Sequence, residues 1–188
     1  NVIDKKLSLR ASITSELVLE DVRLPAEALL PGAKGLGAPL SCLNEARYGI
    51  VWGAAGAAQA CYESALEYAL SREQFGRPIG GFQLTQRKLA DMVVEVNHAR
   101  MAALRLGRLK DEGNCHHNHV SFGKFANVAA AQRVAATARG MHGANGITLE
   151  YPVMRHMVNL ETVATYEGTE EIHVLSIGQS VTGISAFR

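Results

Sequence analysis

One carboxylate in the segment TYEGTEEIH, residues 165–173, is placed where it could act as a general base. Glu167 precedes a glycine and comes just before the start of a predicted helix. Thr169 is a suitable N-cap, and Glu170 and Glu171 fall in the first helical turn, where negative charge meets the helix dipole favourably. Glu167 therefore lies outside the charge pattern of the helix. It is either a solvated loop acid, the commoner case, or a base that reaches into a cleft.

Two loops contain glycine next to groups that could bind a cofactor. The segment REQFGRPIGGFQ, residues 72–83, offers guanidinium groups, which suit phosphate, and an aromatic ring, which suits a stacked base. The simpler interpretation is a helix–helix turn with a solvated Arg and a core Phe. The segment RGMHGANG, residues 139–146, has three glycines three residues apart, but it closes a helix. The dinucleotide-binding fingerprint stands at the start of a helix, not at its end. This loop therefore offers at most a bare backbone surface that a flat cofactor could approach closely.

Other catalytic chemistries lack sequence support. The run CHHNH, residues 115–119, carries metal-ligand types, but its members are nearly contiguous and no second cluster completes a tetrahedral site, so we expect no metal. The three cysteines are widely spaced and predict reduced thiols. Neither a nucleophile elbow, nor a zincin motif, nor a phosphate-binding P-loop occurs in the sequence.

The composition is that of an ordinary water-soluble protein. The 188 residues are 47% apolar and 20% charged, with a net charge of +1, so we expect no nucleic-acid partner. No apolar run reaches the length of a membrane span, and we expect no membrane association. Six Lys against thirteen Arg, with many Ala and Gly, are typical of a GC-rich bacterial genome. They favour a cytoplasmic location.

The chain divides into three parts by composition. The segment LSLRASITSELVLEDV, residues 7–22, is rich in β-branched residues and predicts strands, so we expect residues 1–30 to end a β domain. Because two strands rarely stand alone, we expect the chain to be the C-terminal part of a longer polypeptide. Residues 31–40, PGAKGLGAPL, form a Pro/Gly-rich connector. Residues 41–188 then form a helical domain.

The fold is predicted to be mainly α, an up-down helical bundle. Helices are expected over residues 41–71, 82–111, 119–141 and 153–164, with a fifth from about 169. The second helix carries one apolar stripe at helical spacing: Leu89, Met92, Val93, Val96, Ala99, Ala103 and Leu106. The connections are short, so neighbouring helices should run antiparallel. Ala- and Gly-rich seams on the first and third helices allow close packing, either within the chain or against another subunit.

Five motifs in order carry a family resemblance. They are NEARYGI (44–50), REQFGRPI (72–79), FQLTQRKLADM (82–92), MHGANGI (141–147) and TYEGT (165–169). Each motif alone is weak, but together they are specific, and the chain resembles the acyl-CoA dehydrogenase family. Within the family, RYGIVWG, RHMVNLETVATYEGTEEIH and VTGISAF are most similar to the branch that acts on glutaryl-CoA.

The resemblance implies a flavoprotein. It implies FAD, a homotetramer, electron-transferring flavoprotein as partner, and oxidative decarboxylation of glutaryl-CoA to crotonyl-CoA. A eukaryotic member would lie in the mitochondrial matrix. The catalytic base of the family falls on Glu167, which would remove the α-proton while the β-hydride passes to flavin N5. Two alternatives are another short-chain acyl-CoA dehydrogenase and a non-catalytic relative that keeps the bundle for assembly, although a scaffold has no need of the base.

The resemblance also implies the site residues. Contacts to FAD, partly from a neighbouring subunit, are implied for Arg72, Phe75, Gln83, Gly140, Met141, His142, Gly143, Ala144, Thr169 and Phe187. Contacts to the acyl-CoA substrate are implied for Leu43, Asn44, Arg47, Tyr166 and Gly168.

Overall fold

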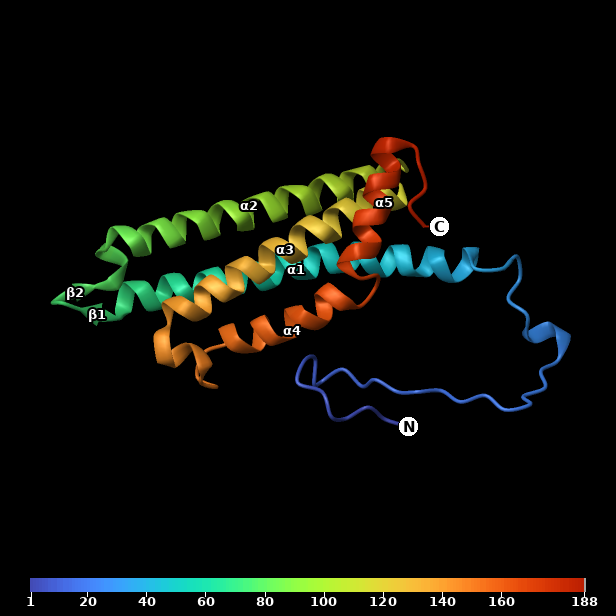
Figure 1. Ribbon diagram of the computed structural model, residues 1–188, viewed down its shortest axis with the longest axis horizontal. Helices are drawn as coiled ribbons and strands as arrows, with labels where there is room; N and C mark the ends of the chain where they lie inside the picture. Colours follow the sequence, from blue (N-terminus) through green and yellow to red (C-terminus); the bar gives the residue numbers. More distant parts are fainter. Residues whose placement is uncertain (188) are drawn as a thin grey trace.

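Three long helices run side by side and form the body of the molecule in the computed structural model, which describes residues 1–187 (Figure 1). They are α1 (Gly37–Ser71), α2 (Gln83–Asp111) and α3 (His117–Met141). Two shorter helices follow, α4 (Val153–Thr165) alongside α3 and α5 (Glu170–Thr182) across the long helices. Short 3-10 segments span Ala26–Ala28, Ile79–Gly81 and Gly143–Ile147. The predicted helical bundle is confirmed.

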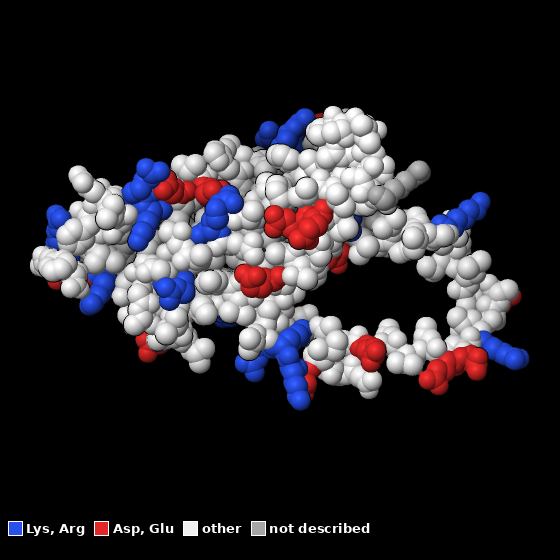
Figure 2. Space-filling view, viewed as in Figure 1, with Lys and Arg blue, Asp and Glu red and all other residues white. Residues whose placement is uncertain are grey.

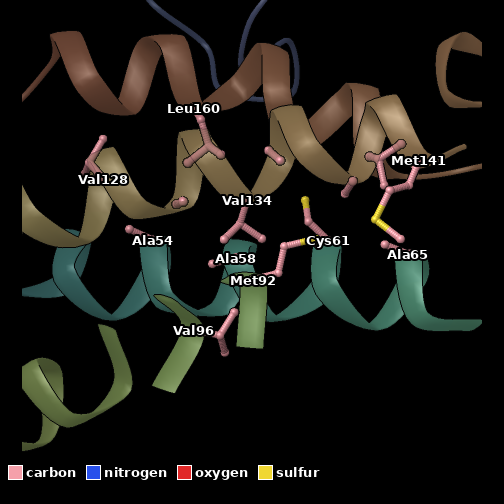
Figure 3. Packing of buried hydrophobic residues seen from close by; sticks show 14 of the residues in the cluster. Ala54, Ala58, Cys61, Ala65, Met92, Val96, Val128, Val134, Met141 and Leu160 are labelled. Carbon is pink, nitrogen blue, oxygen red and sulfur yellow. The ribbon is translucent and has the colours of Figure 1, made fainter. Parts of the chain in front are cut away.

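Helix α3 is the centre of the bundle, because it contacts each of the other four helices. Alanine is the commonest buried residue of α1 and α3, which lets the backbones approach closely, and the larger side chains of Met92, Val134 and Leu160 fill the remaining space (Figure 3). Asn127 ties three helices together, since its side-chain amide donates to Val51 O of α1 at 3.0 Å and to Ala99 O of α2 at 2.9 Å. The three long helices are thus held at a fixed spacing.

The helix ends follow the sequence signals with one exception. Helix α1 begins at Gly37 rather than at residue 41, so part of the predicted connector is helical. Pro39 is accommodated because it lies in the first turn, where backbone N–H groups have no helical partner. Helix α5 begins at Glu170 after Thr169, as predicted, and ends at Gly183, whose φ of 73° is typical of a glycine cap.

A small β-hairpin, absent from the sequence prediction, joins α1 to α2. Strands β1 (Glu73–Gln74) and β2 (Arg77–Pro78) pair antiparallel. The two residues between them, Phe75 and Gly76, have φ values of 53° and 75°, as a two-residue turn with left-handed backbone requires. A phenylalanine in this conformation is unusual and strained.

Residues 7–22, expected to form strands, have no strand pairing among the described residues beyond a single bridge, and their place at the end of a β domain stays a prediction. Among residues 1–36 the antiparallel pairing is limited to one bridge between Val2 and Ser15. The segment is extended, exposed, and leads away from the bundle in Figures 1 and 2. A strand needs neighbours to satisfy its backbone groups, and no further strands lie beside this one in the described chain. Its main anchor is Asn159 of α4, whose Oδ1 accepts from Leu9 N at 2.7 Å.

Acidic and basic side chains are interspersed on the face of the molecule in Figure 2. This mixture fits the net charge of +1. Across residues 1–187, no helix is both long enough and apolar enough to span a bilayer. In the same residues, His, Cys, Asp and Glu side chains do not gather in threes as a metal ion would require.

Candidate active site

Glu167 lies on a tight turn between α4 and α5, outside both helices as the sequence predicts. Its backbone φ is 55° and that of Gly168 is 88°, so two successive residues adopt the left-handed conformation. For a non-glycine residue this conformation is unfavourable, and it persists only where the surroundings hold it. Strain of this kind is concentrated at functional sites.

Two cations hold the turn through its backbone. Lys124 of α3 donates from Nζ to Tyr166 O and to Gly168 O, both at 2.5 Å. Arg47 of α1 donates from Nε to Glu167 O at 2.7 Å. Three consecutive carbonyls therefore accept hydrogen bonds from charged donors, which are stronger than neutral ones.

Two side chains that pack against the turn are fully buried. The side chains of Lys124 and His173 are each 1% exposed. Burial, reinforced by the charge of Arg47, lowers the pKa of Lys124 to about 8, although Glu167 acts in the opposite direction. Burial, with the charges of Lys124 and Arg47, lowers the pKa of His173 to about 4, while the backbone of Glu167 and Gly168 opposes that change. At neutral pH His173 is therefore an uncharged ring.

The Glu167 carboxylate is free to react. Its Oε2 is buried and has no hydrogen-bond partner among the described residues. An unpartnered carboxylate oxygen is available to accept a proton from a carbon acid. Glycine suits position 168, because its φ of 88° is left-handed and a Cβ there would lie tightly against His173 Nε2, at 3.1 Å, and Arg47 Nη2, at 3.2 Å. The turn thus presents one carboxylate within a fixed polar frame.

The predicted substrate-side residues lie partly together. Arg47 contacts the turn directly. Tyr166 adjoins Glu167, and burial, together with the charge of Glu167, raises the pKa of the phenol. Asn44 is half-buried one helical turn before Arg47, and its Oδ1 has no partner among the described residues. Leu43 is half-buried beside it.

Phe187 lies on the Arg47 side of the molecule. Both residues line a pocket of about 510 Å³ formed by α1, α3, α5 and the C-terminal segment. The phenyl ring is 52% exposed. The prediction that Phe187 contacts flavin remains a prediction, as does the same role for Thr169, which is the half-buried N-cap of α5.

Arg72 and the loop that follows α3 form a second cluster. Although they are about 70 residues apart in sequence, Arg72, Met141, His142, Gly143 and Ala144 line one pocket of about 320 Å³. A Cβ added to Gly140 or Gly143 would meet no atom within 4 Å, so the backbone there is open to close approach. A guanidinium beside bare backbone suits an anionic, flat cofactor such as a flavin nucleotide. The residues that line this pocket therefore fit the FAD that the family resemblance implies.

The His142 side chain supports this loop from inside. It is 1% exposed, and its ring stacks on Tyr68 with 4.6 Å between centroids. Nδ1 pairs with Ala138 O at 2.7 Å and Nε2 with Ser64 Oγ at 3.2 Å. Because both nitrogens are occupied, His142 can offer a ligand only its backbone, and the Met141 side chain is also buried.

Phe75 and Gln83 lie beside this pocket rather than in it. Phe75 is 87% exposed at the tip of the hairpin, edge-on to Phe82 at 6.3 Å between centroids. Gln83 lines a separate, open pocket of about 580 Å³ together with Arg77 and Phe82. In Figure 1 the hairpin and the loop after α3 lie at one end of the bundle, away from the α4–α5 junction. The base and the predicted cofactor contacts thus occupy different places on one chain.

Sequence reasoning missed Lys124 and His173. Lys124 falls on the apolar face of α3, four residues after Val120 and four before Val128. A lysine at a core position of a helix is a signal that could have identified it, because lysine is almost never fully buried unless it is paired. His173 likewise lies one turn after Thr169, on the face of α5 that turns inward.

Comparisons with known proteins agree with this geometry. Residues 33–182 match the family model described as "Acyl-CoA dehydrogenase, C-terminal domain". The chain is 38% identical over 183 residues to glutaryl-CoA dehydrogenase of Desulfococcus multivorans, covering 96% of this chain and 47% of that protein.

Two solved structures, both glutaryl-CoA dehydrogenases from Mycobacterium smegmatis, superpose with a TM-score of 0.98 at 64% and 55% identity. The whole of this chain aligns with 49% of each of these two proteins, and the second structure is a complex with FADH2. The chain thus spans about half the length of the relatives it matches. By sequence, fold and motif order, it belongs to the acyl-CoA dehydrogenase family and carries the C-terminal domain of that family.

Proposed function

We propose that this chain acts within an FAD-dependent acyl-CoA dehydrogenase that oxidises and decarboxylates glutaryl-CoA to crotonyl-CoA. The observation that supports it most is the Glu167 carboxylate, whose Oε2 is buried and unpartnered on a turn held by Lys124 and Arg47. A non-catalytic relative would not need to bury an uncommitted carboxylate on a strained backbone, because both cost stability.

In this proposal Glu167 accepts the α-proton of the acyl thioester. Bound FAD supplies the acceptor for the β-hydride, at flavin N5. Loss of the proton and the hydride leaves an α,β-unsaturated thioester, and departure of the distal carboxylate as CO2, with a proton taken up in its place, gives crotonyl-CoA. The turn keeps the carboxylate desolvated and correctly aimed, which is where the chain contributes to the rate.

The cofactor contacts are proposed to serve a neighbouring subunit. The Arg72 pocket lies at the end of the bundle away from the α4–α5 junction, so one chain cannot offer both groups to the same flavin from within this domain. A homotetramer resolves this separation, because Arg72, the hairpin tip and Gly143 can then contact a flavin bound by a neighbouring subunit. The exposed, strained Phe75 suits an aromatic contact made across such an interface.

The substrate assignment rests on similarity. The 64% identity and TM-score of 0.98 are to a glutaryl-CoA dehydrogenase, which favours the same substrate here over a short-chain monocarboxylic acyl-CoA. We further propose electron-transferring flavoprotein as the physiological electron acceptor, in keeping with the family.

The test is an assay of the full-length enzyme with glutaryl-CoA and with butyryl-CoA, following both reduction of an electron acceptor and release of CO2. We expect glutaryl-CoA to give both signals in equal amounts and to be preferred in kcat/KM. Preference for butyryl-CoA, or acceptor reduction without CO2, would instead assign the chain to the short-chain enzymes. Absence of acceptor reduction with any acyl-CoA would refute the dehydrogenase proposal.

A further inference from the structure

The ammonium of Lys124 is buried without a carboxylate bonded to it. It is 1% exposed, and within residues 1–187 it takes part in no salt bridge. Its hydrogen bonds inside the protein go to the carbonyls of Tyr166 and Gly168. Burying a charge in this way is costly, and an apolar side chain of similar length would pack at lower cost in an alanine-rich core. A purely structural position would therefore favour methionine or leucine here.

The two accepting carbonyls lie on either side of Glu167. Both converge on one Nζ at 2.5 Å, so the ammonium closes the backbone around the glutamate into a loop. The backbone of that loop is left-handed at Glu167 and Gly168, a conformation that would relax without an external hold. Since the direction of a side chain follows its backbone, fixing these carbonyls fixes where the carboxylate points.

We propose that Lys124 is the positioning residue of the base: by donating to the carbonyls on either side of Glu167, it holds the turn so that the carboxylate faces the reacting carbon. This inference rests on the proposed role of Glu167. Lys124 itself is buried beneath the turn, so it acts through Glu167 and does not touch the substrate. Removing it should therefore affect the chemical step more than substrate binding.

Replacing Lys124 leaves the other charged and titratable groups around the turn unaltered in the sequence. They are Arg47 from α1, Tyr166 after α4, and His173 and Glu170 from α5, of which Glu170 and His173 line the same small cavity as Lys124. Arg47 keeps its hydrogen bond to Glu167 O at 2.7 Å. A change seen on replacing Lys124 can thus be assigned to the ammonium.

The experiment uses the full-length, FAD-loaded enzyme with rates expressed per bound flavin. Lys124→Met removes both donors and the charge at nearly constant length. We expect kcat to fall by about 10–100-fold while KM changes less than about threefold. The split between kcat and KM is the informative readout, because a purely structural loss would lower the amount of folded flavoprotein and not the rate per bound flavin.

Lys124→Gln tests whether the hydrogen bonds hold the turn. The amide can still donate to a carbonyl, so it should recover part of the kcat that Lys124→Met loses. It also serves if Lys124→Met does not accumulate as a flavoprotein. Lys88→Met, at an exposed position on α2, is the matched control and should resemble the unaltered enzyme in both respects.

A loss of activity that is carried by KM rather than by kcat in the Lys124 variants overturns the inference, even if their melting temperature falls. Unchanged kcat in Lys124→Met overturns it as well. Glu167→Gln, measured in parallel, separates the two proposals: if that variant keeps its activity, the assigned base is wrong. If it loses activity while the Lys124 variants behave normally, only the positioning role is wrong.

Discussion

Protonation of His173 is expected to weaken the folded domain in mildly acidic solution. The ring is 1% exposed, and burial among the cations Lys124 and Arg47 lowers its pKa from 6.5 to about 4. In the unfolded chain it titrates near its ordinary value, so between these two pH values the unfolded state binds more protons than the folded state. The free energy of unfolding therefore decreases as pH falls from about 6.5 to about 4.

The expected size follows from the same two values. One pKa unit corresponds to about 1.4 kcal/mol, so at pH about 5 the His173 contribution is about 2 kcal/mol and its upper limit is about 3 kcal/mol. For a domain of this size, about 2 kcal/mol lowers the melting temperature by about 4–8 °C. This loss should be specific to His173 and absent when the ring is replaced by a neutral amide.

The assay is thermal unfolding of the full-length, flavin-loaded enzyme, followed by far-ultraviolet circular dichroism at pH about 7 and about 5. His173→Gln should show a loss on acidification that is smaller by about 4–8 °C than that of the unaltered protein. His98→Gln, at an exposed position on α2, is the control and should behave as the unaltered protein does. If His173→Gln and His98→Gln lose the same number of degrees, His173 is not kept neutral by the fold and the electrostatic description of the turn is wrong.

Three further predictions concern packing and assembly. Gly123→Ala should destabilise the bundle by about 1–3 kcal/mol in urea unfolding, because the added Cβ would overlap Leu106 Cδ1 and lie 3.2 Å from Val51 Cγ2. Gly49→Ala is the control and should be neutral or stabilising, because no atom lies within 4 Å of the added Cβ. Equal effects of the two substitutions would contradict the packing described. Arg72→Ala in the full-length enzyme should weaken FAD retention and subunit association together, since a cofactor contact made across an interface couples the two equilibria. Full flavin content after dilution, with an unchanged elution volume in gel filtration, would exclude a contact across the interface. Residues 1–188 expressed alone should be helical by circular dichroism but colourless. FAD would lose the contacts that the rest of the protein supplies, and each loss of about 1.4 kcal/mol weakens binding tenfold. A stoichiometric flavin absorption band would show that this chain suffices to bind FAD.

The helices and the location of Glu167 could be predicted from sequence because their signals are local. Helical periodicity, short polar connections and the Thr169 cap depend on residues within a few positions of one another, and these predictions agree with the structure. The early start of α1 does not follow from the sequence pattern, because proline and glycine usually break helices, whereas Pro39 is tolerated in a first turn.

Features that depend on distant residues could not be predicted. The strands expected over residues 7–22 need neighbours that the described chain does not provide, so a suitable pattern gives only an extended segment. The burial of Lys124 depends on where α4 ends and α5 begins, more than 40 residues later in the sequence. Likewise the pocket shared by Arg72 and Gly143 exists only because α1 and α3 end on the same side of the bundle.

The identity of Glu167 as the base is tested most directly by flavin reduction in a single turnover. The full-length enzyme and its Glu167→Gln variant are mixed with glutaryl-CoA without oxygen, and bleaching of the flavin absorbance is followed with time. The amide has the same shape but cannot accept the α-proton, so the rate of bleaching should fall by at least about 100-fold at unchanged flavin content and circular dichroism. Bleaching within about threefold of the unaltered rate would show that another group removes the proton.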